Sequence, residues 1–106
     1  MMSIYLWLLH RLSGFILIFL LLFHLLYFHL FDAPLDYSEI INRIDKPLWK
    51  LFYFIFLITS IYHGTYGMHV IVTEYFSNSS IYKLLRAGLY LLAIGMLWIG
   101  LNFLLL

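Results

Sequence analysis

The segment that decides the fold is LWKLFYFIFLITSIYHGTYGMHVIV, residues 48–72. A helix of this length spans about 37 Å, which exceeds the roughly 30 Å hydrocarbon core of a bilayer. Two further apolar runs extend from about Ile4 to Phe31 and from about Tyr82 to Leu106. The sequence therefore predicts an all-α membrane protein. We expect a single transmembrane domain over residues 1–106, with helices at about 4–31, 48–74 and 81–105.

Composition excludes several other classes of protein. Of the 106 residues, 65% are hydrophobic, 21% aromatic and only 10% charged, unlike a soluble domain. The first run is too long for a secretory signal peptide and lacks a small-residue cleavage site. The chain has no cysteine, which excludes disulfides and iron–sulfur clusters held by this chain. A net charge of +1 argues against nucleic acid as a partner.

Two short polar connections join the three runs. The first ends at Pro47, which suits the first turn of a helix, and residues 39–44 fit one amphipathic turn at the membrane interface. The second, residues 76–80, contains serines that can cap the third helix. With three spans, the N-terminus and the second connection lie on one side. Basic residues occur on both sides, so the positive-inside rule does not set the orientation.

The third run carries Gly88, Gly95 and Asn102 at seven-residue spacing, near one face of a helix. Small residues allow close approach of helices, and an intramembrane amide needs a hydrogen-bond partner. Ordinary helix packing explains this pattern. Three helices alone nevertheless leave polar residues with too few partners, so we expect this chain to bind other membrane chains.

His63 is a candidate cofactor ligand because it lies deep in the second run. Counted from Tyr75, it is about 18 Å into the membrane, where an imidazole is costly and usually functional. His63, Gly67, Val70 and Glu74 share one helical face. Gly67 leaves space beside the imidazole for a flat macrocycle, and imidazole is a good haem-iron ligand. The residues alone leave two alternatives open: a haem ligand, or a histidine that is structural or relays protons.

The first run contains a second deep histidine and a single cation. His24 is about 20 Å from Arg11 by helical rise, and it shares a face with His10. Arg11 can extend to the surface, or bind a haem propionate or a quinone carbonyl. His69 is nearer the membrane edge and is expected to have a polar partner there. His29 is expected to be interfacial.

Two motifs resemble one family. Residues 10–14, His-Arg-Leu-Ser-Gly, look like the His-Arg-x-Ser/Thr-Gly motif in the first helix of cytochrome b anchor subunits of succinate dehydrogenase. The second helix resembles that family's His-x-x-x-Gly pattern, followed by an acid–aromatic pair, here at His63, Gly67, Glu74 and Tyr75. The resemblance covers nearly the whole chain.

The resemblance implies a function. The chain would form half of a heterodimeric anchor bundle, together with a second three-helix anchor, beneath an iron–sulfur subunit and a flavoprotein. His63 would be an axial ligand of haem b, with its partner histidine on the sister chain. Arg11 would line the quinone pocket or hold a propionate. Tyr75 would hydrogen-bond a quinone oxygen, and Glu74 would be the nearby acid.

The same resemblance implies a location and an orientation. The chain would lie in a bacterial or archaeal cell membrane, or in the mitochondrial inner membrane. Its N-terminus would face the catalytic subunits, in the cytoplasm or matrix. Alone it would catalyse nothing.

The chain also departs from the family pattern. Trp7 stands where the first type of anchor has a serine, and Glu74 replaces the usual aspartate. The first-helix motif is typical of the first anchor type and favours it, whereas the pair Glu74 and Tyr75 looks more like the second. His24 resembles the first-helix ligand of two-haem members, so one or two haems remain possible. The alternatives are a haem b anchor of another quinone-linked dehydrogenase, or a non-haem structural membrane subunit.

Overall fold

The computed structural model describes residues 4–27 and 36–105. Within these residues the chain forms four helices, which in order are α1 (Ile4–Leu25), α2 (Tyr37–Ile44), α3 (Pro47–Phe76) and α4 (Tyr82–Leu105). The long helices α1, α3 and α4 are each apolar enough to cross a bilayer. The predicted all-α class and the three predicted spans are therefore confirmed.

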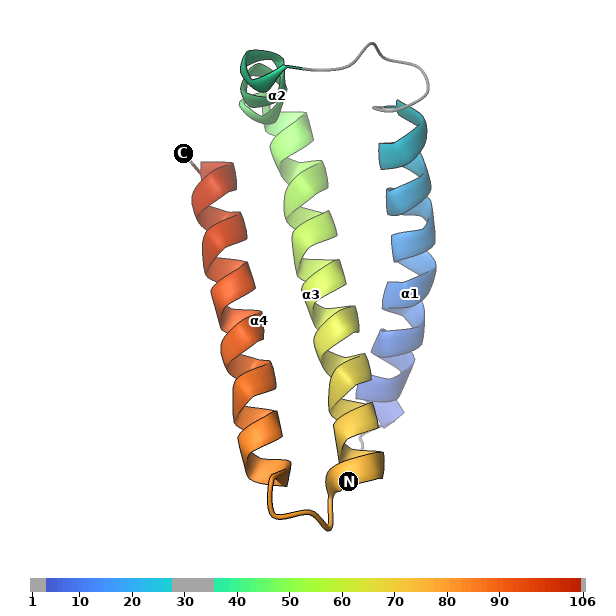
Figure 1. The fold of residues 1–106 in the computed structure, drawn as a ribbon. Helices are drawn as coiled ribbons and strands as arrows, with labels where there is room; N and C mark the ends of the chain where they lie inside the picture. The colour runs from blue at the N-terminus through green and yellow to red at the C-terminus, as the bar shows by residue number, and fades with distance from the viewer. Residues whose placement is uncertain (1–3, 28–35, 106) are drawn as a thin grey trace.

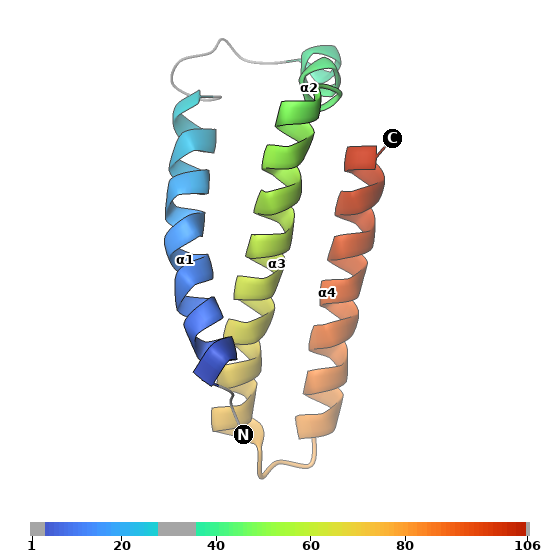
Figure 2. The same cartoon turned by 180° about the vertical axis from the view of Figure 1, so that it is seen from behind.

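The three long helices lie side by side, with α3 between α1 and α4 (Figures 1 and 2). The start of α1 and the α3–α4 connection are at one end, as expected, while α2 lies at the other. At 30 residues, α3 is about 45 Å long and extends past the start of α1 (Figure 1). This overhang determines which residues of α1 and α3 lie at the same depth.

The helix boundaries differ slightly from those expected. Helix α3 starts at Pro47, as its sequence favours, and continues to Phe76, two residues further than predicted. The α-helical part of the first span ends at Leu25, and the next two residues continue in π-helical geometry. The rest of the expected first span, including His29, lies outside the described residues.

An amphipathic turn was expected at residues 39–44, and helix α2 forms there. The carboxylate of Asp36 caps it by accepting a hydrogen bond from the backbone N–H of Glu39, at 2.9 Å. This bond, with a second from the Ser38 hydroxyl, lowers the pKa of Asp36. The Arg43 guanidinium lies over the rings of Tyr27 and Trp49, at 5.2 and 5.6 Å. These contacts hold α2 against the end of the first span and the start of α3.

The second connection also contains a cap that the sequence suggested. The Ser79 hydroxyl accepts a hydrogen bond from the backbone N–H of Ile81, just before α4 begins. A further hydrogen bond, of 3.0 Å, links the hydroxyls of Thr73 and Tyr82 across the connection. The turn therefore holds the end of α3 against the start of α4.

Few side chains are buried within the described chain. Most large apolar residues of the three long helices are exposed, including Phe19 on α1 and Trp98 on α4. A soluble protein would not leave such surfaces to water, whereas lipid or other membrane helices would cover them. This pattern agrees with the expectation of membrane partner chains.

At Gly100, α4 lies tightly against a side chain of α3. A methyl group at this position would lie 2.6 Å from one Leu57 methyl carbon and 2.7 Å from the other. The expected packing positions behave differently: a methyl group at Gly88 or Gly95 would meet nothing within 4 Å. The Asn102 amide donates to a carbonyl of its own helix, at Trp98. Within the described chain, Gly100 is therefore the glycine at which α4 packs closely against α3.

Gly100→Ala is expected to destabilise the folded bundle, because the Leu57 side chain must leave its place. Overpacking of this kind costs about 1–3 kcal/mol. Gly88→Ala is the matched control, and should be neutral or stabilising by up to about 1 kcal/mol through helix propensity. Thermal melting of the detergent-solubilised protein measures both. Equal melting temperatures for the two variants would contradict the predicted contact.

Candidate functional site

The cluster that contains His63 lies where α1 and α3 pack together. The two helices are antiparallel, so residues 10–14 of α1 face residues 63–67 of α3. Two motifs that are 50 residues apart in the sequence thus meet inside the membrane-spanning part of the bundle. The sequence suggested each motif separately, and the structure brings them together.

The His63 ring is fixed by its Nδ1 atom. Nδ1 lies 3.1 Å from the Ser13 hydroxyl oxygen and 3.3 Å from the backbone carbonyl oxygen of His10. The Ser13 hydroxyl already donates to that same carbonyl, at 2.7 Å. Both neighbours of Nδ1 therefore act as acceptors, and we assign the proton of His63 to Nδ1. This tautomer leaves Nε2 with a free lone pair, the form of imidazole that binds a metal.

His10 packs directly on His63. Their rings stack with centroids 4.3 Å apart, and the Tyr66 ring lies 4.9 Å from that of His10. A methyl group at Gly67 would lie 3.5 Å from His10 Nε2. In this chain, the space beside Gly67 is thus occupied by His10. The Nε2 atom of His10 is buried and has no hydrogen-bond partner among residues 4–27 and 36–105.

Gly14 allows α1 to approach the His63 ring closely. A methyl group at Gly14 would lie 2.9 Å from His63 Cε1 and 3.5 Å from Nδ1. Real Cβ atoms essentially never come so near another atom. The Ser13–Gly14 pair therefore does two things: the serine holds the imidazole, and the glycine gives it room.

The predicted quinone residues do not meet in the described chain. Arg11 follows His10 directly, so it is level with the His63–Gly67 part of α3. Its guanidinium lies 4.4 Å from the ring centre of Trp7. Tyr75 is near the end of α3 and 76% exposed, and Glu74 is exposed beside it. Since His10 faces Gly67, Arg11 and Tyr75 are about nine residues of α3, or about 14 Å, apart along the bundle.

His24 forms a separate polar pair near the end of the bundle that carries α2. Its Nδ1 lies 3.1 Å from the Tyr53 hydroxyl, and its ring meets Phe56 edge-on. A cavity of about 410 Å³ beside it is lined in part by Ile44 of α2 and Gly100 of α4. His24 is about 15 Å from the level of His63, which corresponds to ten residues of either helix. The two histidines therefore belong to different sites.

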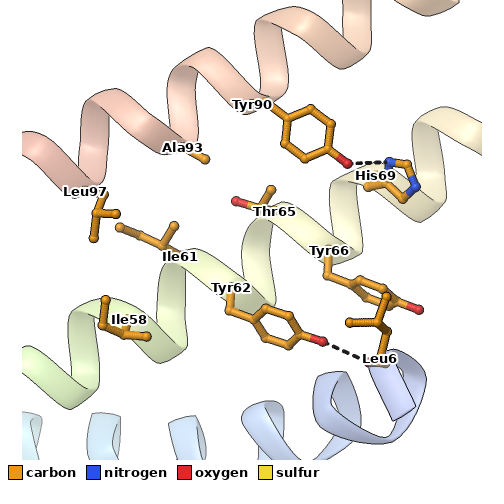
Figure 3. A pocket seen from close by; sticks show the side chains of 10 residues that line it. All are labelled: Leu6, Ile58, Ile61, Tyr62, Thr65, Tyr66, His69, Tyr90, Ala93 and Leu97. Carbon is orange, nitrogen blue, oxygen red and sulfur yellow. Dashed lines mark hydrogen bonds between the residues drawn. The ribbon is translucent and has the colours of Figure 1, made fainter. Parts of the chain in front are cut away.

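His69 has the polar partner that the sequence predicted. Its Nδ1 lies 3.2 Å from the Tyr90 hydroxyl, which links α3 to α4 (Figure 3). Sequence reasoning missed Tyr53 and Tyr66, which contact His24 and His10. Tyrosine is frequent here, with 9 in the chain, so its presence gave no signal. The helical period could have placed Tyr66 near His63, three residues away, but not against His10.

The donor chemistry at His63 is that which a haem-binding histidine would need, although His10 fills the space beside Gly67. The assigned tautomer leaves a lone pair on Nε2, and an orienting bond from Nδ1 to a backbone carbonyl is typical of metal-bound histidine. Among the described residues, no three His, Cys, Asp or Glu side chains form a group that could hold a metal ion. A haem brings four nitrogen ligands of its own, so a single histidine from this chain suffices.

Comparison with known proteins covers both helices of this site. The sequence model of the family described as succinate dehydrogenase/fumarate reductase transmembrane subunit matches residues 2–101. The succinate dehydrogenase hydrophobic membrane anchor subunit of Rickettsia bellii is 34% identical over 88 residues, covering 83% of this chain and 70% of the relative. The subunit of the same name from Thermoplasma acidophilum is 36% identical over 64 residues, covering 58% of this chain and 52% of that relative.

Proposed function

Because this chain belongs to the succinate dehydrogenase/fumarate reductase transmembrane-subunit family, we propose that it holds haem b through His63 and helps to form the quinone site of the complex. The chain is an integral membrane protein that anchors such a complex. Our proposal concerns the cofactor, the quinone site and the partner subunits.

The observation that carries the proposal is the placement of two oxygen atoms at His63 Nδ1, from which we assign its proton. Its Nδ1 is held by Ser13 and by the His10 carbonyl, at 3.1 and 3.3 Å. Nε2 is therefore available to iron. When bound, haem b supplies an iron that takes up and releases one electron at a time. His63 would hold the haem together with a histidine of the sister anchor chain, and a haem held by two histidines would be suited to electron transfer.

The role of this chain's residues in quinone reduction follows from their positions. Quinone reduction takes up two protons as well as two electrons, so hydrogen-bonding groups near an aqueous face are needed. Tyr75 and Glu74 are exposed at the end of α3, where protons can be exchanged with water. Arg11 is deeper, near the level of the His63 cluster. It would therefore bind a haem propionate, or the quinone oxygen that lies further from the aqueous face.

The partners and orientation complete the proposal. A second three-helix anchor would cover the exposed face of α1 and α3 and bring the other axial histidine. The iron–sulfur subunit and the flavoprotein would bind at the end that carries Tyr75 and the start of α1. This end would face the cytoplasm or the matrix. The catalytic chemistry on succinate or fumarate would belong to those subunits.

A reduced-minus-oxidised absorption spectrum of the purified complex tests the cofactor assignment. We expect the absorption bands of a low-spin, bis-histidine haem b. The number of haem irons per complex then decides the role of His24. Two haems would indicate that His24 binds the second haem, whereas one haem would indicate that His24 only hydrogen-bonds Tyr53. A complex that oxidises succinate but has no haem absorption would show that this chain is a non-haem anchor.

Tyr75→Phe tests the quinone assignment. Loss of one hydrogen-bond donor is expected to lower quinone reductase activity about tenfold or more. Succinate oxidation with a soluble dye as acceptor should be unchanged, because the dye bypasses the anchor. Tyr37→Phe is the matched control, since Tyr37 is equally exposed, at 76%, but lies at the opposite end of the bundle. Equal quinone rates for the two variants would rule out a direct role for Tyr75.

A further inference from the structure

A partly open cavity of about 420 Å³ lies between α3 and α4 (Figure 3). Tyr66, which also contacts His10, lines part of it. The start of α1 closes one side, where the Tyr62 hydroxyl donates a 2.9 Å hydrogen bond to the Leu6 carbonyl. On the α4 side, Ala93 contributes only a methyl group to the wall. The volume falls within the roughly 300–1,000 Å³ range of small-molecule sites.

The wall of this α3–α4 cavity is polar at one end and apolar at the other. The hydrogen-bonded pair of His69 and Tyr90 forms the polar end, about 10 Å along α3 from its terminus. Ile58 and Leu97 form the apolar end, where Ile58 lies about 27 Å from the same terminus. An elongated molecule with one polar end would match this gradient along the membrane normal.

The polar end can still form hydrogen bonds with a ligand. A tyrosine hydroxyl donates one bond and accepts up to two, so its bond to His69 uses only part of its capacity. If Tyr90 donates to His69, it can accept from an alcohol; if His69 donates, Tyr90 can donate to a carbonyl. The lining includes no Asp, Glu, Lys or Arg. A charged head group would therefore be unpaired at a depth of about 10 Å, which is costly in lipid.

We propose that the α3–α4 cavity binds a neutral, membrane-soluble molecule with a hydroxyl or carbonyl group at one end and an apolar chain. The polar group lies at Tyr90 and His69, and the chain extends toward Ile58 and Leu97. This site shares Tyr66 with the His63 cluster, but its polar end, formed by His69 and Tyr90, is not among the haem or quinone residues proposed above. Two sources supply this chemistry in a membrane: an isoprenoid quinone stored away from the reaction site, or a neutral lipid.

Photolabelling of the purified complex tests this site with a diazirine-bearing long-chain alcohol as the probe. Labelled peptides, identified by mass spectrometry, are expected to come from residues 58–69 and 90–97. Ala93→Leu fills the cavity and should lower this labelling about tenfold or more, which corresponds to a loss of most of the binding. Ala87→Leu, on an exposed part of the same helix, should leave the labelling unchanged.

Tyr90→Phe separates recognition of the polar group from simple filling of space. It should weaken labelling by the alcohol probe but leave labelling by a hydrocarbon probe of equal length unchanged. Competition then identifies the source: a short-tailed quinone displaces the probe if quinone is the ligand, and a diacylglycerol displaces it if a neutral lipid is. Labelling that is unaffected by Ala93→Leu, or by both competitors, would overturn the proposal.

Discussion

The His63→Ala complex is expected to lose the haem b absorption band that depends on this chain. Alanine provides no atom that can bind iron, and the remaining axial histidine, from the partner chain, cannot hold a haem in a low-spin, six-coordinate state alone. The measurement is the dithionite-reduced minus oxidised spectrum, with haem quantified per complex. If a second haem is bound near His24, its share of the absorption should remain.

The control for this prediction is His69→Ala. His69 lies on the same helix but faces α4 and bonds Tyr90, so its loss should leave the haem absorption unchanged. Added imidazole provides a second measurement, since it fits the space that the His63 ring vacates and should restore the band. A His63→Ala complex with full haem content would contradict the ligand assignment. Loss of haem in both variants would indicate a general loss of structure instead.

The three spans could be predicted from the sequence because bilayer thickness sets a minimum length for an apolar helix. Residues 48–72 and 82–106 satisfy this requirement without knowledge of any other element. The local signals at Pro47 and at the serines before α4 were equally readable, because a cap depends only on its neighbours in the chain. These features required no information about how the helices pack.

The depth of Arg11 could not be predicted in the same way. Counted from the start of its own helix, Arg11 appears close to the membrane surface and to Tyr75. In the structure His10 faces Gly67 and Gly14 faces His63, so Arg11 lies about nine residues of α3 away from Tyr75. The relative register of two helices is a tertiary property, and helical periodicity does not contain it. The same register places His10 in the space beside Gly67, where a macrocycle was expected.

A single methyl group introduced by Gly14→Ala is expected to disturb the geometry of the proposed ligand His63. The new Cβ would lie 2.9 Å from His63 Cε1, so the imidazole must move away from Ser13 and the His10 carbonyl. Overpacking costs about 1–3 kcal/mol. If this cost falls on the ligand geometry, haem retention weakens by about 5- to 150-fold. Haem per complex after gel filtration, and the position of the reduced absorption band, measure the effect.

Gly64→Ala is the matched control for Gly14→Ala, because it adds a methyl group next to His63 in sequence but meets nothing within 4 Å. It should retain haem fully.

A double-mutant cycle then shows whether Gly14→Ala acts through the His63 ring. If Gly14→Ala acts through the His63 ring, it should lower the melting temperature in the wild-type background but not in His63→Ala, where the ring is gone. In that background alanine should stabilise α1 by up to about 1 kcal/mol. An equal loss of stability in both backgrounds would mean that the methyl group collides with the α3 backbone, and that Gly14 has no specific relation to the histidine.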